Sequence, residues 1–360
     1  MTNPSLECLE RLENYLIEHE IERFADLQLD YQPKILGCGG SSIIYHTTFQ
    51  GKNYALKSYN INVYMDDKTL KKFIKELKIF QKVDHPNIIK FYGVSKIQGG
   101  RLFWKNFMFV LQFAEGGSLR DHLKAKRQNN SYEISWNELI KIAKDIVLGL
   151  TYLHSKGIIH RDLHSNNILI NDNKALIADF GISKQLDETS ISSSGAIGML
   201  PYIDPQCVRH NQKPVKESDI YSVGVLLWEL TSGRPPSYNP IKTTSENVPS
   251  DYIVLYEECW SPERDKRPKL DNILVTLDKL SREITIESIT SKDTINENYR
   301  ISSNFPNESR SILGSDSSSY KTTISNLSSF FSNESYSSFS SSASTESNKT
   351  PSSNFLSVSF

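Results

Sequence analysis

Residues 158–170 read IIHRDLHSNNILI, and residues 178–181 read ADFG. Apolar residues stand at both ends of the first stretch, and the polar segment between them holds Asp162 and Asn167. Charged and amide side chains seldom gather between apolar strands, because leaving water costs them free energy unless they meet a partner. The stretch therefore indicates a functional loop between two strands.

Phosphoryl transfer is the chemistry that suits these residues. It needs a carboxylate that orients or deprotonates the attacking hydroxyl, and oxygen ligands that hold magnesium on the phosphates of ATP. Asp162 meets the first need, and Asn167 and Asp179 meet the second. We therefore predict Asp162 and Asn167 as catalytic residues, and Asn167 and Asp179 as ligands of Mg²⁺.

Two motifs that precede this loop point to the same chemistry. Residues 36–45 read LGCGGSSIIY, and glycines let a backbone approach phosphates closely, although a plain β-turn is an equal alternative for this stretch alone. Residues 54–57 read YALK, which places Lys57 in an apolar strand where a lone charge is costly to bury. Glu76, beside the apolar stripe of the next predicted helix, is its expected partner. A solvated edge-strand lysine is the alternative.

The pattern of elements predicts an α+β fold with two lobes. Short β-branched and aromatic runs, followed by a helical stripe and then by longer helical patterns, indicate a small antiparallel sheet with one helix and a mainly helical second lobe. Ser135 and Glu138 have the spacing of a capping box at the start of a long helix that ends at Gly157. The expected strands are Pro33–Cys38, Ser42–Thr48, Asn53–Tyr59 and Phe107–Phe113, and the expected helices include Lys68–Lys82 and a buried one around Ile220–Leu230.

Length and composition limit the remaining classes of protein. The 360 residues carry 41 Lys and Arg against 42 Asp and Glu, so net charge favours neither nucleic acid nor an acidic membrane as a partner. The four cysteines lack CxxC or Cys/His spacing, which argues against a zinc site or a disulfide framework. No apolar run reaches membrane-spanning length. We expect a soluble cytoplasmic protein, with a nuclear location still open.

A change of composition near residue 282 divides the chain. Of the last 60 residues, 24 are serine, which is too polar a composition to bury a core. We therefore predict a helical or linker segment at 1–30, a catalytic domain at 31–281 and a disordered tail at 282–360. The lobes of the domain are expected at about 31–113 and 114–281.

Together these motifs resemble the eukaryotic protein kinase family, whose signature stretches occur here in the same order. The resemblance covers about two thirds of the chain. Residues 221–224 (YSVG), 228–230 (WEL) and 259–260 (CW) are most similar to the tyrosine-kinase-like Ser/Thr kinases. The resemblance implies an ATP-dependent enzyme of intracellular signalling that phosphorylates Ser or Thr, less readily Tyr, of a protein substrate with Mg²⁺.

The resemblance also implies roles for single residues. Lys57 contacts the α- and β-phosphates while it pairs with Glu76, and both count as catalytic residues. Leu111 lies at the entrance to the hinge. ATP is expected to contact Leu36, Gly37, Gly39, Ile44, Ala55, Lys57, Gln112, Ala114 and Leu169, and a packed column between the lobes is expected from Phe80, His160 and Phe180 above Asp219.

Several positions depart from the pattern of the family. Ser42 replaces the third glycine of the loop, His164 replaces a lysine and Met199 replaces a threonine. Gln206 replaces a glutamate that pairs with a buried arginine, here Arg267, so we expect some loss of stability.

The stretch between Gly233 and Cys259 is also short for the family, so a helix that often docks substrates is expected to be absent. These departures leave a second reading, a pseudokinase that serves as an ATP-binding scaffold. Retention of all the charged residues needed for transfer favours the active enzyme.

Overall fold

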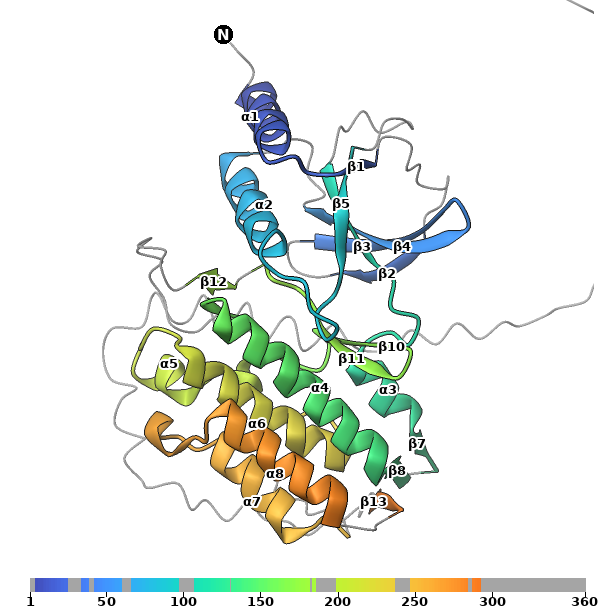
Figure 1. Cartoon of the computed structure of the whole chain (residues 1–360), viewed down its shortest axis with the longest axis vertical. Helices are drawn as coiled ribbons and strands as arrows, with labels where there is room; N and C mark the ends of the chain where they lie inside the picture. The colour runs from blue at the N-terminus through green and yellow to red at the C-terminus, as the bar shows by residue number, and fades with distance from the viewer. Residues whose placement is uncertain are drawn as a thin grey trace, which may run out of the picture. The chain divides into compact units, whose positions relative to one another are not determined.

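The computed structural model describes residues 4–24, 34–38, 42–59, 66–96, 107–129, 131–181, 183–185, 199–236, 247–283 and 287–292. Strands dominate the first part of this chain and helices the second (Figure 1). In the described part, no helix has the length and apolar character needed to cross a membrane. The expected disorder of residues 293–360, the loop residue Gly39 and the short stretch 237–246 lie outside the described residues.

One six-stranded sheet forms the first lobe, in the order β1-β5-β6-β4-β3-β2. The pairs from β5 to β2 are antiparallel as expected, whereas β1 runs parallel to β5. The sequence predicts β2, β3, β4 and β6. It misses β1, which has two residues, and β5, which Gly93 interrupts with an irregular register. The bounds are β1 Arg23–Phe24, β2 Ile35–Cys38, β3 Ser42–Phe49, β4 Lys52–Tyr59, β5 Phe91–Lys96 and β6 Phe107–Gln112.

Helix α2 (Asp67–Phe80) confirms the predicted helix and packs its apolar stripe inward. The carboxylate of Asp66 accepts a hydrogen bond of 2.7 Å from the backbone N–H of Thr69, which satisfies one of the free donors at the helix start. Leu70, Phe73 and Leu77 are fully buried. Glu76 lies on this buried side of the helix, so its carboxylate faces the interior of the lobe.

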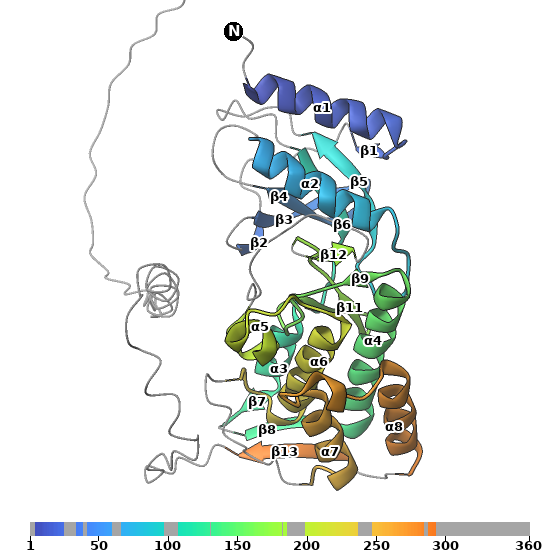
Figure 2. The same ribbon diagram turned by 90° about the vertical axis from the view of Figure 1, so that its left-hand side faces the viewer.

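Helix α1 (Pro4–Glu18) lies within the segment predicted to be helical or a linker, and it packs against α2 (Figure 2). Leu12 and Leu16 are 0% and 1% exposed. Arg11 forms an ion pair with Asp67 at one end of α2, with Nη1 and Oδ1 3.0 Å apart. The hydroxyl of Tyr15 donates to Gln81 at the other end of α2. The N-terminal segment is thus part of the first lobe, whose described residues form two helices and not the one expected.

Replacing Leu16 by alanine is expected to lower the free energy of unfolding by about 2–5 kcal/mol, because it leaves a cavity between α1 and the lobe. Chemical denaturation monitored by circular dichroism measures the change. Ile17 is the matched control, since its side chain on the same helix is 64% exposed. Ile17→Ala should change stability by less than about 0.5 kcal/mol. Equal effects of the two variants would contradict the packing of α1.

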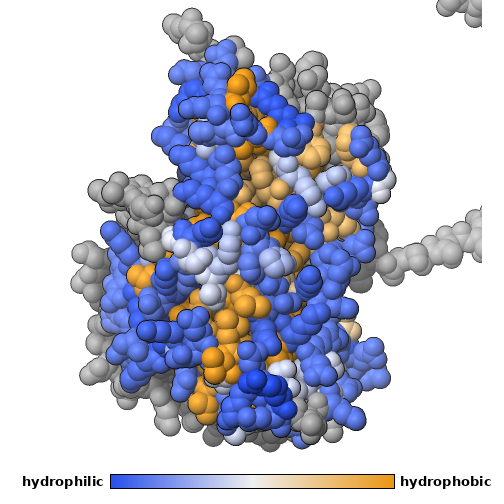
Figure 3. Space-filling view, in the orientation of Figure 1, coloured by the Kyte–Doolittle hydropathy of each residue, from blue (hydrophilic) through white to orange (hydrophobic). Residues whose placement is uncertain are grey.

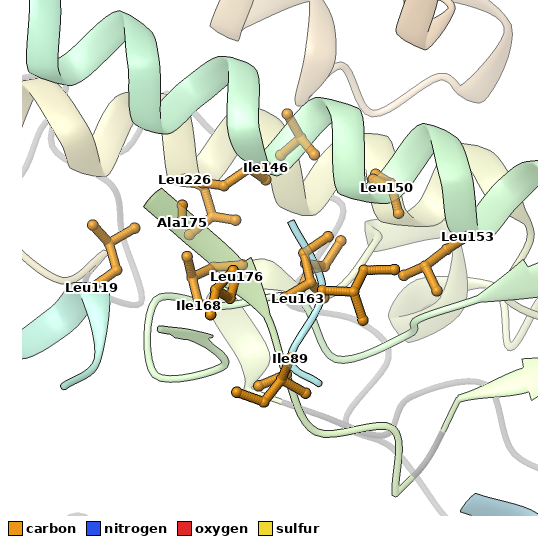
Figure 4. Packing of buried hydrophobic residues seen from close by; sticks show 14 of the residues in the cluster. Ile89, Leu119, Ile146, Leu150, Leu153, Leu163, Ile168, Ala175, Leu176 and Leu226 are labelled. Atoms are coloured by element: carbon orange, nitrogen blue, oxygen red, sulfur yellow. The ribbon is translucent and has the colours of Figure 1, made fainter. Parts of the chain in front are cut away.

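The second lobe is built around two long helices, α4 (Trp136–Ser155) and α6 (Lys216–Ser232). The capping box is half confirmed: Ser135 caps α4 by accepting from the N–H of Glu138, whose own carboxylate turns to His122 and Lys126. Nearly every residue of α6 is buried, as predicted. Ile146 of α4 lies beside Leu226 of α6, and Leu150 and Leu153 of α4 belong to the same core (Figure 4). The other helices are α3 Leu119–Ala125, α5 Pro205–Arg209, α7 Ser250–Cys259 and α8 Leu270–Glu283.

A three-stranded sheet closes the far end of this lobe, in the order β13-β8-β7. Its strands are β7 (Arg127–Gln128), β8 (Ser131–Ser135) and β13 (Ser288–Lys292). Because β13 pairs with β8 and buries Ile289 completely, the boundary predicted at 281 is too early by about one strand. The strand was not predicted, because it lies in a polar stretch and only one of its side chains is apolar and enters the core.

Most of the face seen in Figure 3 is hydrophilic, but an apolar strip crosses the second lobe. Exposed apolar side chains on this lobe include Leu148 of α4 and Val275 of α8, the second of which is 67% exposed. Single exposed apolar residues are usual on protein surfaces.

Candidate active site

Lys57, from the middle of β4, connects two carboxylates. Its Nζ lies 2.8 Å from Oε1 of Glu76 and 2.7 Å from Oδ1 of Asp179. The side chains of Lys57 and Glu76 are 4% and 0% exposed, so the alternative of a solvated edge-strand lysine is wrong. Asp179 remains 43% exposed. Among these three groups, only the side chain of Asp179 is substantially exposed to solvent.

Charge attraction outweighs burial for Lys57 and Asp179 of this cluster, but not for Glu76. Burial by itself would lower the pKa of Lys57, but Glu76 and Asp179 raise it above its ordinary value. Burial would raise the pKa of Asp179, yet the attraction of Lys57 brings it down to about 2. For Glu76 burial dominates and raises the pKa, with Lys57 acting in the opposite direction. The charge of Lys57 thus compensates two carboxylates.

Tyr59 is a member of this cluster that sequence reasoning missed. Its hydroxyl donates to Oε2 of Glu76, and its ring packs against Phe73 and Phe109. The side chain is 6% exposed. Tyr59 stands two residues after Lys57 on β4, so it points to the same face of the sheet. This spacing of two residues along the predicted strand could have indicated that Tyr59 lies beside Lys57.

The loop after β9 (Ile158–Ile159) is held from below by Asp219 of α6. Its carboxylate accepts hydrogen bonds from the backbone N–H groups of His160 and Arg161, at 2.9 and 2.8 Å. Arg161 adopts a left-handed backbone with φ of 73°, which is unfavourable for a residue with a side chain and persists only where its surroundings impose it. Asp162 follows directly and is 22% exposed. Asp162 is therefore partly exposed to solvent on a loop whose backbone is held rigidly.

Asn167 and Asp179 stand on either side of a hairpin that follows this loop. The hairpin consists of β10 (Ile168–Asn171) and β11 (Lys174–Ile177). The amide nitrogen of Asn167 donates to the carbonyl of Asp162 at 2.9 Å. This bond directs the nitrogen inward and leaves the amide oxygen as a ligand. The N–H of Ala178 donates to the carbonyl of Asn167, which links the two ligand-bearing segments.

These donor groups fit ATP and a divalent cation. Mg²⁺ prefers one or two protein oxygens together with phosphate oxygens and water. The amide oxygen of Asn167 and the partly exposed carboxylate of Asp179 are oxygen ligands of this kind. Lys57 is already held beside Asp179, where it can reach a phosphate.

The residues expected around adenine come from neighbouring strands. Ala55 pairs with Leu111 across β4 and β6, and both are buried. Ile44 lies opposite Lys57 on β3 and is half-buried, like Leu169 of β10. Gln112 ends β6, and Ala114 follows in the connection to the second lobe. At the loop, Leu36 is 40% exposed and Gly37 has open space around it.

The predicted column of side chains between the lobes is present. The ring centroids of Phe80 and Phe180 are 5.4 Å apart, and those of Phe180 and His160 are 5.5 Å apart. Phe91 of β5 stacks on Phe80 at 4.9 Å and extends the column by one ring. Sequence reasoning missed Phe91 because it missed the strand.

A buried polar network supports the loop on its other side. Glu229 of α6 pairs with Arg120 of α3, whose Nε lies 2.8 Å from Oε1. The hydroxyls of Ser165 and Tyr202 donate to the same carboxylate. None of these links was expected from the sequence, because the residues lie far apart along the chain. The network connects the loop that carries Asp162 to the segment around Tyr202.

Comparison with known protein families identifies the family to which this site belongs. The family model described as "Protein kinase domain" matches residues 31–321, which is most of the chain. The chain belongs to the protein kinase family. ATP and a protein are therefore the substrates implied for this kinase, together with a divalent metal ion.

Curated relatives agree with the tyrosine-kinase-like resemblance. The kinase is 30% identical over 270 residues to a probable LIM domain-containing serine/threonine-protein kinase of Dictyostelium discoideum, covering 70% of this chain and 39% of the relative. It is 30% identical over 274 residues to a serine/threonine/tyrosine-protein kinase of Arabidopsis thaliana, covering 71% and 67%. Mitogen-activated protein kinase kinase kinase 10 of Mus musculus is 31% identical over 289 residues, covering 72% and 28%. The kinase thus spans well under half the length of the Dictyostelium and mouse relatives, and about two thirds of the Arabidopsis relative.

The buried arginine of this kinase keeps a charged partner, contrary to expectation. Nη2 of Arg267 lies 2.8 Å from Oδ1 of Asp204, two residues before Gln206, and both side chains are fully buried. Arg264 reaches the other oxygen of Asp204 at 2.7 Å. Gln206 instead donates to the carbonyl of Pro262. The predicted loss of the charge-assisted bond is wrong, because Asp204 supplies the carboxylate.

Proposed function

We propose that this kinase transfers the γ-phosphate of magnesium-ATP to serine or threonine hydroxyls of proteins, and less readily to tyrosine. The observation that carries the proposal is the buried Lys57–Glu76 pair, with Asp179 bound to the same amine. Burying two such charges is justified only by their mutual contact, and the contact places Lys57 next to the exposed carboxylate. The names of the curated relatives support phosphoryl transfer to the hydroxyls of Ser and Thr.

In the proposed reaction each residue has one task. Lys57 binds phosphate oxygens and is kept in place by Glu76. Asn167 and Asp179 would hold Mg²⁺, which neutralises charge on the phosphates. Asp162 orients the substrate hydroxyl and accepts its proton as the bond from that oxygen to the γ-phosphorus forms, while the bond from the γ-phosphorus to the β-phosphate oxygen breaks and ADP leaves. Rigid support of Asp162 by Asp219 keeps this geometry ready before substrate binds.

A scaffold without catalysis is less well supported. A scaffold has no need for five polar groups whose positions suit transfer, and the described contacts of Lys57, Glu76 and Asp179 fit a competent site. We propose a cytoplasmic location, which the four unpaired cysteines support.

Wild-type protein is expected to transfer labelled γ-phosphate from magnesium-ATP to itself or to a generic protein substrate, with label on phosphoserine and phosphothreonine. Lys57→Met should lower the rate by about 10²–10³-fold, since it removes one preorganised cation from the phosphates. Lys52→Met is the matched control, because Lys52 is exposed on the same strand. Folded, ATP-binding wild-type protein without transfer would reject the proposal, and label on tyrosine alone would reject the stated specificity.

A further inference from the structure

His164 lies beside the predicted catalytic carboxylate and is almost fully buried. Its side-chain Nε2 is 3.5 Å from Oδ1 of Asp162. The residue is 8% exposed. Its other ring nitrogen, Nδ1, is buried and has no hydrogen-bond partner among the described residues. A ring with one unsatisfied nitrogen is unusual, because buried polar atoms are generally paired.

The backbone around His164 is fixed by its neighbours. The carbonyl of His164 accepts a hydrogen bond of 2.8 Å from the N–H of Asn167. The next residue, Ser165, donates its hydroxyl to Glu229 at 2.9 Å and accepts from the N–H of Arg120. The imidazole ring lies 5.9 Å from the ring of Tyr202, centroid to centroid. These contacts fix the backbone from which the imidazole extends, and Nε2 is the ring nitrogen that faces Asp162.

The surroundings also select the tautomer. A hydrogen on Nδ1 would be a buried donor without an acceptor, and the lone pair of Nε2 would then face the carboxylate of Asp162. A hydrogen on Nε2 faces the carboxylate of Asp162. The arrangement therefore favours the tautomer that carries its hydrogen on Nε2, as is usual where one ring nitrogen meets a carboxylate.

We infer that His164 is a positioning residue of phosphoryl transfer, an inference that rests on the proposed function. When substrate binds, its Nε2–H donates to Oδ1 of Asp162, so that the other carboxylate oxygen faces the substrate hydroxyl. The separation of 3.5 Å exceeds that of a formed hydrogen bond, and such contacts commonly shorten when substrate binds. His164 itself touches neither phosphate nor hydroxyl, and it acts through Asp162.

Steady-state kinetics of the full chain test the inference. His164→Ala is expected to lower kcat by about 10–100-fold, because small misplacement of a catalytic group has effects of this size. The KM for ATP should change by less than about a factor of three, since ATP binding does not involve this contact. His164→Gln places a neutral N–H donor at similar reach and should recover much of the rate. Added imidazole should raise the rate of His164→Ala.

Two comparisons separate positioning from a purely structural role. His122→Ala is the control, because His122 on α3 pairs with Glu138 away from the loop. Its kcat should equal that of wild type. The inference is overturned if His164→Ala keeps wild-type kcat while Asp162→Asn is inactive. It is also overturned if His164→Gln and imidazole fail to raise the rate above that of His164→Ala. Absence of transfer by wild-type protein overturns the proposed function first, and the inference with it.

Discussion

Replacing Asp162 by asparagine is expected to lower kcat by about 10²–10⁴-fold, the usual contribution of a positioned acid or base. Asparagine keeps the size of the side chain but accepts no proton at neutral pH. The backbone of the loop should be unaffected, because Asp219 holds it through the N–H groups of His160 and Arg161. Initial rates of γ-phosphate transfer at saturating ATP and substrate measure the effect.

The fold and ATP affinity of this variant should match those of wild type. Melting temperature and the dissociation constant of a fluorescent ATP analogue report these properties separately from the rate. Asp271→Asn is a suitable control, since Asp271 is an exposed aspartate on α8. Retention of more than about a tenth of wild-type kcat by Asp162→Asn would show that Asp162 is not the base.

Replacing Asp204 by alanine is expected to lower the free energy of unfolding by about 3–5 kcal/mol, because it leaves buried Arg267 without its carboxylate. Arg264 loses the same partner, and so does the hydroxyl of Ser218. Urea denaturation measures the loss. Gln206→Ala is the control: it removes only a bond to the carbonyl of Pro262 and should cost less than about 1.5 kcal/mol.

The effect of Asp204 should depend on pH in one direction. Burial tends to raise the pKa of Asp204, but Arg267 and the other donors lower it to about 2, below the ordinary value of 3.8. The carboxylate therefore stabilises the fold fully above pH 3.8, and this stabilisation is lost as the pH falls toward 2. The difference in stability between wild type and Asp204→Ala should shrink over that range. A difference that grows on acidification would contradict the assigned ion pairs.

Sequence patterns predicted the chemistry well, because transfer demands particular side chains within short stretches of chain. Lys57 and Glu76 could be paired from burial cost alone, since a charge in an apolar strand requires a counter-charge. The same reasoning failed for Arg267. Its partner depends on how two distant segments meet, and no local pattern distinguishes Asp204 from Gln206.

Packing between segments was the least predictable part of the fold. Phe91 was not predicted as part of a strand, because Gly93 breaks the alternation of β5. A side chain at position 93 would collide with the backbone of Glu22, next to β1. The network around Glu229 likewise joins four elements that only the folded chain brings together. Such contacts leave no periodic signal in any one segment.

The docking of α1 and β1 affects where a recombinant chain can safely start. The family match begins at residue 31, after both elements. A chain trimmed to that residue would uncover the apolar surface that Leu12 and Leu16 now shield. It would also free the outer edge of β5, where the N–H of Val94 is bonded to the carbonyl of Glu22. Open strand edges pair readily with other chains, so the shortened protein should be prone to self-association through its first lobe.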